Sequence, residues 1–561
     1  MDTFRRLTPV TVLVCAAAVL VLITKSMEAA DNFELTILHT SDLHGQVLPF
    51  DDSRDRGAPG SLARVSAAVT AIRTSTDHPV LLLDSGDTIQ GTPFEEMTHV
   101  RWREASPTIE AMNRIAYAAM AVGNHEFNFG LDPLRRAEAQ AEFPFLAANA
   151  IEVTTGKPAF QPFLVTQFGG LKVGLLGLVT PNIPGWEEPA HYEGLAFQPM
   201  DEAARYWVPL LRDKERCDLV IVLAHTGIEV DPETGEADGT AYENFGDRLA
   251  RVPGIDLLLT GHAHQNLPPR LLHGTIVSQP SARGRVMTRI DLELDRTGES
   301  PASIVSWHGE NIDLGASEVD QALVENFEPQ HRRVVEALAL PVTVVDRVVT
   351  VRGCRLRDCA AQDLIHQVQL KASGADLSLA SLLTGGTPDL PPGPVTSRWV
   401  SSLYVYPNTL RSVRLNGAQV KDVLEFSARY YDGVECPPTG PCVVIVDPDV
   451  RHYNIDTMQG LSYRIDPTRP EGDRVRDLRR NGRPLDLQAD FTLVCNNYRA
   501  AGGGGYPHLA EAEVIWRSPK EVASMIDDYL AGLKRWSPEA DMNWVIAPEI
   551  FEEKRPDHNE K

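Results

Sequence analysis

Short runs of apolar residues alternate with helical patterns along the first half of the chain. Six of these runs read ELTILH, VLLLD, AMAVG, LKVGLLGLV, DLVIVLAH and IDLLLTG. Continuous apolar runs of this length predict strands that are buried on both faces. Between the runs, residues 62–72 and 201–214 carry the spacing of amphipathic helices. This alternation predicts an α/β domain, in which helices pack on the faces of a largely parallel sheet.

The pattern changes after about residue 315. Residues 316–340 are charged and helical in pattern, and Pro329 interrupts them, so we expect a connecting segment that breaks at the proline. Beyond it, a helical pattern at 418–430 is mixed with strand-like runs such as LSYRID and FTLVC. The predicted division is a first domain over 31–315, a connecting segment over 316–340, a second domain over 341–545 and a polar tail over 546–561.

The first thirty residues have the pattern of an export signal. Two arginines precede an uncharged apolar run at 10–23, and Ala29 and Ala30 follow it. A run of this length is short for a membrane-spanning helix but typical of a signal peptide. Met27 or Glu28 stands where a small residue is expected before cleavage, so an uncleaved anchor is the alternative. We expect a periplasmic or secreted protein without a stable membrane partner after cleavage of residues 1–30.

Composition and charge narrow the class of partner. The chain has 561 residues, of which 43% are hydrophobic and 23% charged, which excludes a disordered protein and requires more than one core. Its net charge is −24, which argues against nucleic-acid polymers as partners because those need a basic surface. An anionic substrate would therefore need a local source of positive charge.

Six cysteines remain after the expected signal peptide. Cys436 and Cys442 flank the turn CPPTGPC, and Cys354 and Cys359 are also close in sequence, so we predict these two disulfides in an exported protein. The remaining two, Cys217 and Cys495, adjoin apolar runs and are predicted to be buried free thiols. Because no CxxC pair is present, a zinc ribbon is excluded.

Five predicted strands end in polar clusters, which is where α/β folds place their chemistry. A single histidine at a strand end is usually structural, and Asp87 and Asn124 each follow a glycine and could be turn residues. A purely structural role does not easily explain five such clusters in succession along the chain. Carboxylate, amide and imidazole donors without thiolate indicate hard-to-borderline divalent metals, in sufficient number for two ions. The clustered residues are Asp42 and His44; Asp87; Asn124, His125, Glu126 and Asn128; His225; and His262 and His264.

The motifs DLHG, GDTIQGTP, GNHEFNFG and GHAH, with His225 between the last two, resemble those of the calcineurin-like metallophosphoesterases, in particular the exported bacterial nucleotidases. The resemblance implies a four-layer β-sandwich with helices on both sides and two divalent ions (Mn, Zn, Co or Fe) at the strand ends. Such ions, about 3.5–4 Å apart, activate water and offset phosphoryl charge. The resemblance implies that Asp87 bridges the metals and that His125, which is not a ligand, stabilises the transition state and assists the leaving oxygen. The implied ligands are Asp42, His44 and His264 for one metal, and Asn124, His225 and His262 for the other.

Two positions depart from the 5′-nucleotidase pattern. That group has an aspartate where this chain has Asn128, which still accepts a hydrogen bond from His125 but stabilises an imidazolium less. It also often has glutamine at the position of His264. Both features resemble the 2′,3′-cyclic-nucleotide 2′-phosphodiesterase/3′-nucleotidase relatives.

The motifs LYVYPNTL, YNIDTMQGLSYRID, CNNYRAAGGGGYP and SPEADMNW resemble the smaller α+β nucleotidase C-terminal domain of the same relatives. The resemblance implies that Tyr406 and Tyr498 sandwich the base, an interaction of about 1–3 kcal/mol per base. Glycines 503 and 504 lie in a run whose backbone can approach a ligand closely. Gly504 stands where 5′-nucleotidases have a ribose-binding aspartate, and their arginine-bearing GGIR clamp is not visible near residues 383–386. By contrast, Tyr404, Tyr430 and Tyr453 are predicted to be core or edge aromatics.

We therefore expect an exported, monomeric, dinuclear-metal phosphoesterase. The expected reaction opens 2′,3′-cyclic nucleotides to 3′-nucleotides and then releases phosphate to give nucleosides. A 5′-nucleotidase is the first alternative. A thiosulfohydrolase, which needs no base sandwich, and a non-catalytic binding module are the remaining alternatives.

Overall fold

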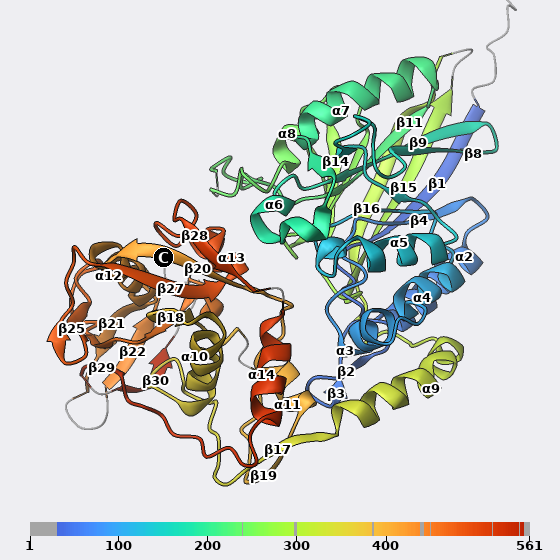
Figure 1. Cartoon of the computed structure of the whole chain (residues 1–561). Helices are drawn as coiled ribbons and strands as arrows, with labels where there is room; N and C mark the ends of the chain where they lie inside the picture. Colours follow the sequence, from blue (N-terminus) through green and yellow to red (C-terminus); the bar gives the residue numbers. More distant parts are fainter. Residues whose placement is uncertain are drawn as a thin grey trace, which may run out of the picture.

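The computed structural model describes residues 31–237, 239–296, 300–383, 386–437, 442–448, 450–518, 520–548 and 550–554. The predicted signal peptide, residues 1–30, lies outside these ranges. Within them, no helix combines the length and apolar character needed to cross a membrane. Figure 1 shows two bodies, the N-terminal part from blue to yellow-green and the C-terminal part from yellow to red.

Two six-stranded sheets form the centre of the N-terminal domain. All six predicted strands are present in them, and the neighbouring pairs β1–β4 and β11–β12 are parallel. In sheet order the first contains β16 (Ser303–Asp313), β15 (Val286–Arg296), β1 (Asp31–Thr40), β4 (Val80–Asp84), β5 (Ala119–Ala121) and β6 (Phe145–Leu146). The second contains β13 (Asn266–Leu272), β14 (Thr275–Pro280), β12 (Leu257–Thr260), β11 (Leu219–His225), β9 (Leu171–Val179) and β8 (Phe163–Phe168).

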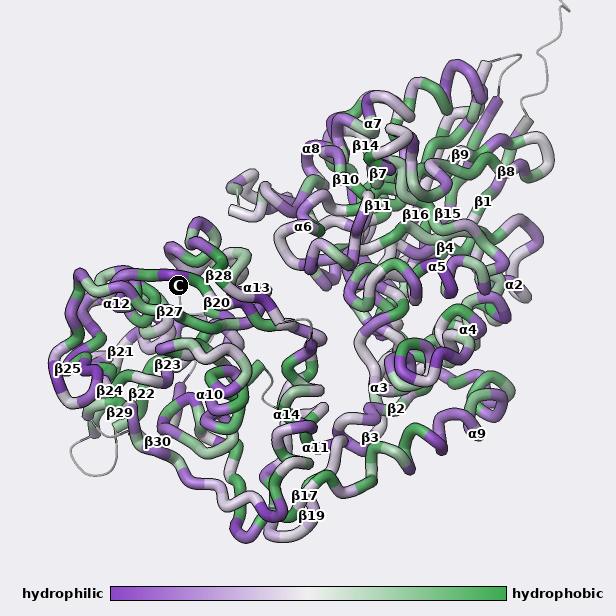
Figure 2. The backbone as a smooth tube through the Cα atoms, viewed as in Figure 1, coloured by the Kyte–Doolittle hydropathy of each residue, from purple (hydrophilic) through white to green (hydrophobic). Residues whose placement is uncertain are grey.

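Alternate side chains of the central strands enter different cores. In β11, Leu219, Ile221 and Leu223 pack between the two sheets, whereas Val220 and Val222 pack against helices on the outer face. The outer face of the first sheet packs against α2 (Leu62–Ser75), α4 (Pro107–Ile115), α5 (Leu131–Gln140) and α9 (Gln321–Leu338). The outer face of the second packs against α7 (Met200–Pro209) and α8 (Gly246–Ala250). The expected four layers of helix, sheet, sheet and helix are confirmed, with apolar strands enclosed by more polar helices (Figure 2).

The connecting segment differs from its prediction. The helix α9 continues through Pro329 although the sequence predicted a break there. A proline removes one helical hydrogen bond, but Leu323, Phe327, Val334 and Leu338 are buried along one stripe of this helix. That continuous apolar contact stabilises the helix on both sides of the proline.

The C-terminal domain is α+β, as expected. A five-stranded sheet contains β23 (Thr457–Gln459), β18 (Leu377–Ala380), β27 (Asp490–Asn496), β20 (Leu410–Asn416) and β28 (Val514–Arg517). Its buried side chains pack against α10 (Ala360–Ser373), α11 (Ser397–Leu403), α12 (Gly417–Ala428) and α14 (Val522–Ala531). Two smaller sheets contain β21 (Tyr431–Glu435), β22 (Cys442–Val446) and β30 (Ile550–Lys554), and β26 (Arg483–Pro484), β25 (Val475–Arg480), β24 (Ser462–Ile465) and β29 (Trp544–Ile546).

The segment expected to be a polar tail therefore includes a paired strand, since β30 lies parallel to β22. Residues 555–561 lie outside the described ranges. The cysteines follow the prediction: Cys354–Cys359 and Cys436–Cys442 form disulfides, while Cys217 and Cys495 are free and buried.

Candidate dinuclear metal site

The loops that follow the parallel strands meet at one edge of the N-terminal sheets. Thr40, the last residue of β1, is in register with Asp84, the last residue of β4. Beyond these positions, the Asp42 N–H donates to the Gly86 carbonyl at 2.8 Å and the His44 N–H to the Asp87 carbonyl at 2.9 Å. The first two polar clusters are thus joined by backbone hydrogen bonds.

Most of the predicted ligands have a backbone conformation that side-chain-bearing residues seldom adopt. Non-glycine residues are uncommon at positive φ, and such strain concentrates at functional sites. The surrounding loops hold these residues in that conformation and so direct their side chains to one place. The φ values are 52° for Asp42, 49° for His44, 60° for Asp87, 67° for His262 and 54° for His264.

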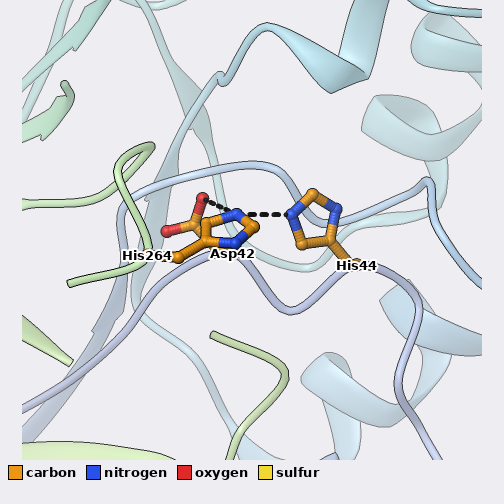
Figure 3. A group of neighbouring side chains, drawn as sticks. All are labelled: Asp42, His44 and His264. Carbon is orange, nitrogen blue, oxygen red and sulfur yellow. Dashed lines mark hydrogen bonds and ion pairs between the residues drawn. The ribbon is translucent and has the colours of Figure 1, made fainter. Parts of the chain in front are cut away.

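The first group of candidate ligands consists of Asp42, His44 and His264, each with a ligand atom within 4.8 Å of the others. His264 lies between the other two, with its Nε2 atom 3.0 Å from His44 Nε2 and 3.3 Å from Asp42 Oδ1 (Figure 3). Two imidazole nitrogens that face each other at this distance are arranged as ligands of one cation would be.

The second group consists of Asp87, His225 and His262, again within 4.8 Å of one another. His225 Nε2 lies 3.0 Å from Asp87 Oδ2 and 3.0 Å from Asn124 Oδ1. His262 Nδ1 lies 2.9 Å from the same Asn124 oxygen. All seven predicted ligands thus lie in two adjacent sets, and Asp87 contacts the second.

Outer hydrogen bonds orient two of these imidazoles in the way that metal sites require. His225 Nδ1 lies 2.7 Å from the Ser85 carbonyl oxygen, and His44 Nδ1 lies 3.2 Å from the Gln90 carbonyl oxygen. Because a carbonyl only accepts, each Nδ1 carries a proton, and Nε2 is the atom through which each ring would bind a cation. The donor chemistry of the two sets therefore fits two divalent cations.

The charges of the site also favour cations. Burial would raise the pKa of Asp42, but the imidazoles of His264 and His225 lower it to about 2. Burial would likewise lower the pKa of His225, but Asp87 raises it to about 10. Both carboxylates are therefore ionised, and their field stabilises positive charge in an otherwise desolvated place.

His125 lies next to the two groups without belonging to either. Its Nδ1 is 2.6 Å from Asn128 Oδ1, and its Nε2 is 3.9 Å from Asp87 Oδ2. Its backbone N–H donates to Asp87 Oδ1 at 2.8 Å. This position, with a side chain 27% exposed, suits a group that acts on substrate and not a ligand.

Two supporting residues received no role from the sequence, although Glu126 lay within one of the polar clusters. Buried Glu126 accepts backbone N–H groups of Asp87 (2.9 Å), Thr88 (2.6 Å) and Gly123 (2.6 Å), and so fixes the loop that carries Asp87. Glu187 accepts from the Asn128 amide at 2.6 Å. Glu126 lies within the GNHEFNFG motif, which offered a signal, whereas Glu187 stands in an irregular segment with no recognisable spacing.

A cavity of about 740 Å³ opens between this site and the C-terminal domain, and it is lined by His44, His125, His264 and Tyr406. Tyr406 is 42% exposed. Tyr404 and Tyr453 also line the cavity, whereas Tyr498 is not among the described residues that do. Tyr404 lies in a core cluster and Tyr453 packs against that cluster, as the sequence predicted.

Tyr498 has a neighbour on one face of its ring. A Cβ atom at Gly503 would approach the ring carbons to 2.6 Å, and one at Gly504, where φ is 77°, would approach Asn454 Oδ1 to 2.6 Å. Both glycines are therefore required by close packing. The base sandwich of Tyr406 and Tyr498 stays a prediction.

Two family models match the chain, calcineurin-like phosphoesterase over residues 35–266 and the 5′-nucleotidase C-terminal domain over residues 337–511. The 2′,3′-cyclic-nucleotide 2′-phosphodiesterase/3′-nucleotidase of Yersinia enterocolitica is 29% identical, across 94% of this chain and 90% of its own. The trifunctional nucleotide phosphoesterase protein YfkN of Bacillus subtilis is 28% identical across 93% of this chain, which spans 39% of that relative. A solved Staphylococcus aureus structure, assigned as a 5′-nucleotidase, is 28% identical with a TM-score of 0.79, covering 93% of this chain and 100% of its own.

Proposed function

Because the chain joins a calcineurin-like phosphoesterase domain to a 5′-nucleotidase C-terminal domain, and so is a hydrolase of phosphoric esters, we propose a specific nucleotide reaction for it. The enzyme opens 2′,3′-cyclic nucleotides to 3′-nucleotides and then releases phosphate to leave nucleosides. The relative from Yersinia enterocolitica supports this assignment by its name and by near-complete coverage. The pair Asn128 and His264, which departs from the 5′-nucleotidase pattern, supports it further.

The proposed ligands are Asp42, His44 and His264 for one divalent cation and Asn124, His225 and His262 for the other, with Asp87 between them. When bound, the two cations supply Lewis-acid activation of water and neutralise charge on the phosphoryl oxygens. The protein keeps Asp42 and Asp87 ionised, and the Nδ1 contacts of His44 and His225 leave their Nε2 atoms as the atoms that would bind a cation. The observation that carries the proposal is this convergence of the two donor sets, of which His44 and His264 line the cavity.

His125 acts on the reacting ester. Hydrolysis breaks the bond between phosphorus and a ribose oxygen, and that oxygen needs a proton as it leaves. His125 Nδ1 donates a hydrogen bond to Asn128 Oδ1, which leaves Nε2 to hold the proton for the leaving oxygen. Tyr406 and Tyr498 hold the base by stacking, which tolerates every base.

Export is part of the proposal. The sequence pattern of residues 1–30 supports delivery to the periplasm or the medium, where the enzyme works as a monomer on free nucleotides. The excess of 77 acidic over 53 basic residues supports free nucleotides over polymeric nucleic acid as substrates.

The second candidate is a 5′-nucleotidase, which the Staphylococcus aureus structure favours. Phosphate release from 2′,3′-cAMP, 3′-AMP and 5′-AMP, measured side by side with metal-loaded enzyme, separates the two. We expect kcat/KM to be highest for the 2′,3′-cyclic and 3′ substrates. A preference for 5′-AMP would replace the proposal with the second candidate.

A further inference from the structure

A chain of four side chains leads away from the cavity behind His125. His125 Nδ1 lies 2.6 Å from Asn128 Oδ1, and the Asn128 amide nitrogen donates to Glu187 Oε1 at 2.6 Å. The other Glu187 oxygen lies 2.9 Å from His191 Nδ1. Each contact is within hydrogen-bond range. The chain therefore links His125 to a carboxylate 59 positions beyond Asn128 in the sequence.

The chemistry of these groups settles the orientation of the Asn128 amide. A carboxylate is only an acceptor, so the NH₂ group of Asn128 must face Glu187. The carbonyl oxygen of the amide then faces His125, and only a protonated Nδ1 can donate to it. Glu187 thus determines which end of the Asn128 amide faces His125. It thereby also determines which nitrogen of the His125 ring faces the cavity.

Glu187 itself has little freedom to move. Its side chain is 6% exposed, and it lies between the short helix α6 (Ile183–Trp186) and a 3-10 turn at Pro189–Tyr192. Two residues of the C-terminal domain donate hydrogen bonds to the backbone of this segment. Arg411 donates to the carbonyls of residues 185 and 187 at 3.2 and 3.1 Å, and Asn497 donates to the carbonyl of residue 186 at 2.6 Å.

We propose that Glu187 is a positioning residue for His125, acting through Asn128. Its carboxylate orients the amide and, by polarising it, supplies the negative charge that Asn128 lacks. Asn128 and Glu187 together then do what a single aspartate at position 128 would do alone. The inference rests on the proposed function only in that His125 must act on the leaving oxygen of a phosphoric ester.

The double variant Asn128→Asp with Glu187→Gln, called here the reversed pair because it exchanges the amide and the carboxylate, tests this directly. In Glu187→Gln the carboxylate charge is lost, and in Asn128→Asp two carboxylates face each other. Each single change should lower kcat for 3′-AMP by on the order of 10- to 100-fold, part of the roughly 10²- to 10⁴-fold that a positioned acid contributes. In Asn128→Asp with Glu187→Gln, the new carboxylate accepts from both His125 and the Gln amide, so most of the lost kcat should return.

The matched control is Glu188→Gln combined with Asn128→Asp. Glu188 is the adjacent acid on the same segment, but its carboxylate contacts Arg411 and Arg517, so this pair should show no recovery. Glu187→Gln should also reduce kcat for 3′-AMP more than for p-nitrophenyl phosphate, whose leaving group needs no proton. KM, metal content and the thermal midpoint should stay near those of the wild type.

Recovery in the reversed pair would support the proposal even if one single variant folds poorly. Additive losses in the reversed pair, wild-type kcat in Glu187→Gln, or equal losses on the two esters would overturn it. Failure of the proposed function looks different, because the wild-type enzyme would then prefer 5′-AMP or release no phosphate from any nucleotide, and both results appear without any variant.

Discussion

Among the described residues, a cluster of carboxylates lies in each domain, and the neighbours of the two clusters differ. In the N-terminal domain, Asp42 and Asp87 face imidazoles, which hold the pKa of both carboxyl groups below the ordinary range although burial opposes this. In the C-terminal domain, Asp358, Asp363 and Asp541 have ligand atoms within 4.8 Å of one another. Burial and mutual repulsion raise the pKa of Asp358 to about 6 and that of Asp363 to about 7.

The difference shows why proximity of acids alone does not define a catalytic metal centre. The N-terminal cluster combines ionised carboxylates with imidazole and amide ligand atoms that lie close together, and such a set binds borderline cations. The C-terminal cluster has no such donors and relieves its repulsion by keeping protons. The first arrangement fits a catalytic metal site, whereas the second is expected to affect only stability.

The largest expected effect is that of Asp87→Asn. The substitution keeps the shape of the side chain but removes the charge placed between the two donor sets. We expect a folded protein that loses bound metal and on the order of 10³-fold or more in kcat/KM, comparable to loss of a principal electrostatic stabiliser. Metal analysis and phosphate release measure this, and near wild-type values for both would show that no bridging role exists.

His125→Ala should separate chemistry from metal binding. Because His125 belongs to neither donor set, its loss should lower kcat by about 10²- to 10⁴-fold and leave the metal content unchanged. Elemental analysis beside steady-state kinetics decides between the roles. Loss of one metal equivalent would make His125 a ligand.

Tyr406→Ala and Tyr498→Ala should weaken nucleotide binding by smaller factors. Loss of one stacking face is worth about 1–3 kcal/mol, or about 5- to 150-fold in kcat/KM, mostly through KM. Hydrolysis of p-nitrophenyl phosphate should change little. The Phe variants are the control, since they keep the stacking face, and an equal loss on both substrates would indicate a packing role instead.

The smallest effect concerns the C-terminal cluster and appears in stability alone. The folded pKa of Asp363, about 7, is above its ordinary value of 3.8, so the folded state holds a proton that the unfolded state has released between these values. Stability should therefore fall as pH rises from about 4 to 7.

Asp363→Asn removes that proton uptake. It should reduce the loss of unfolding free energy between about pH 4 and 7 by on the order of 1–3 kcal/mol. Urea unfolding at several pH values measures this, with kcat followed as the control. An unchanged pH dependence would show that Asp363 titrates normally.

Much of the fold of the first domain could be predicted from the sequence, because the pattern of the strands determines which loops meet. Buried parallel strands place their ends at one edge, so Asp42 and Asp87 could be predicted to lie together. His225 ends a strand of the second sheet, and only the family resemblance implied that it lies beside them. The positive φ values of the ligands could not be predicted, since they depend on loop contacts such as those of Glu126.

Other features could not be predicted because they depend on contacts distant in sequence. Glu187 meets Asn128 across 59 positions, and nothing in the segment GWEEP signals this. The break expected at Pro329 was wrong because burial of one stripe of α9 outweighs the single lost hydrogen bond. The packing of Gly503 against Tyr498 likewise required the folded chain.

The central claim is that the chain holds two metal ions at the N-terminal cluster and none at the C-terminal one. Elemental analysis of Mn²⁺-loaded, dialysed protein tests it most directly, in the wild type, Asp87→Asn and Asp363→Asn. We expect about two equivalents per chain in the wild type and in Asp363→Asn, as a dinuclear site requires, and fewer in Asp87→Asn. Loss of an equivalent in Asp363→Asn, with Asp87→Asn unchanged, would contradict the account.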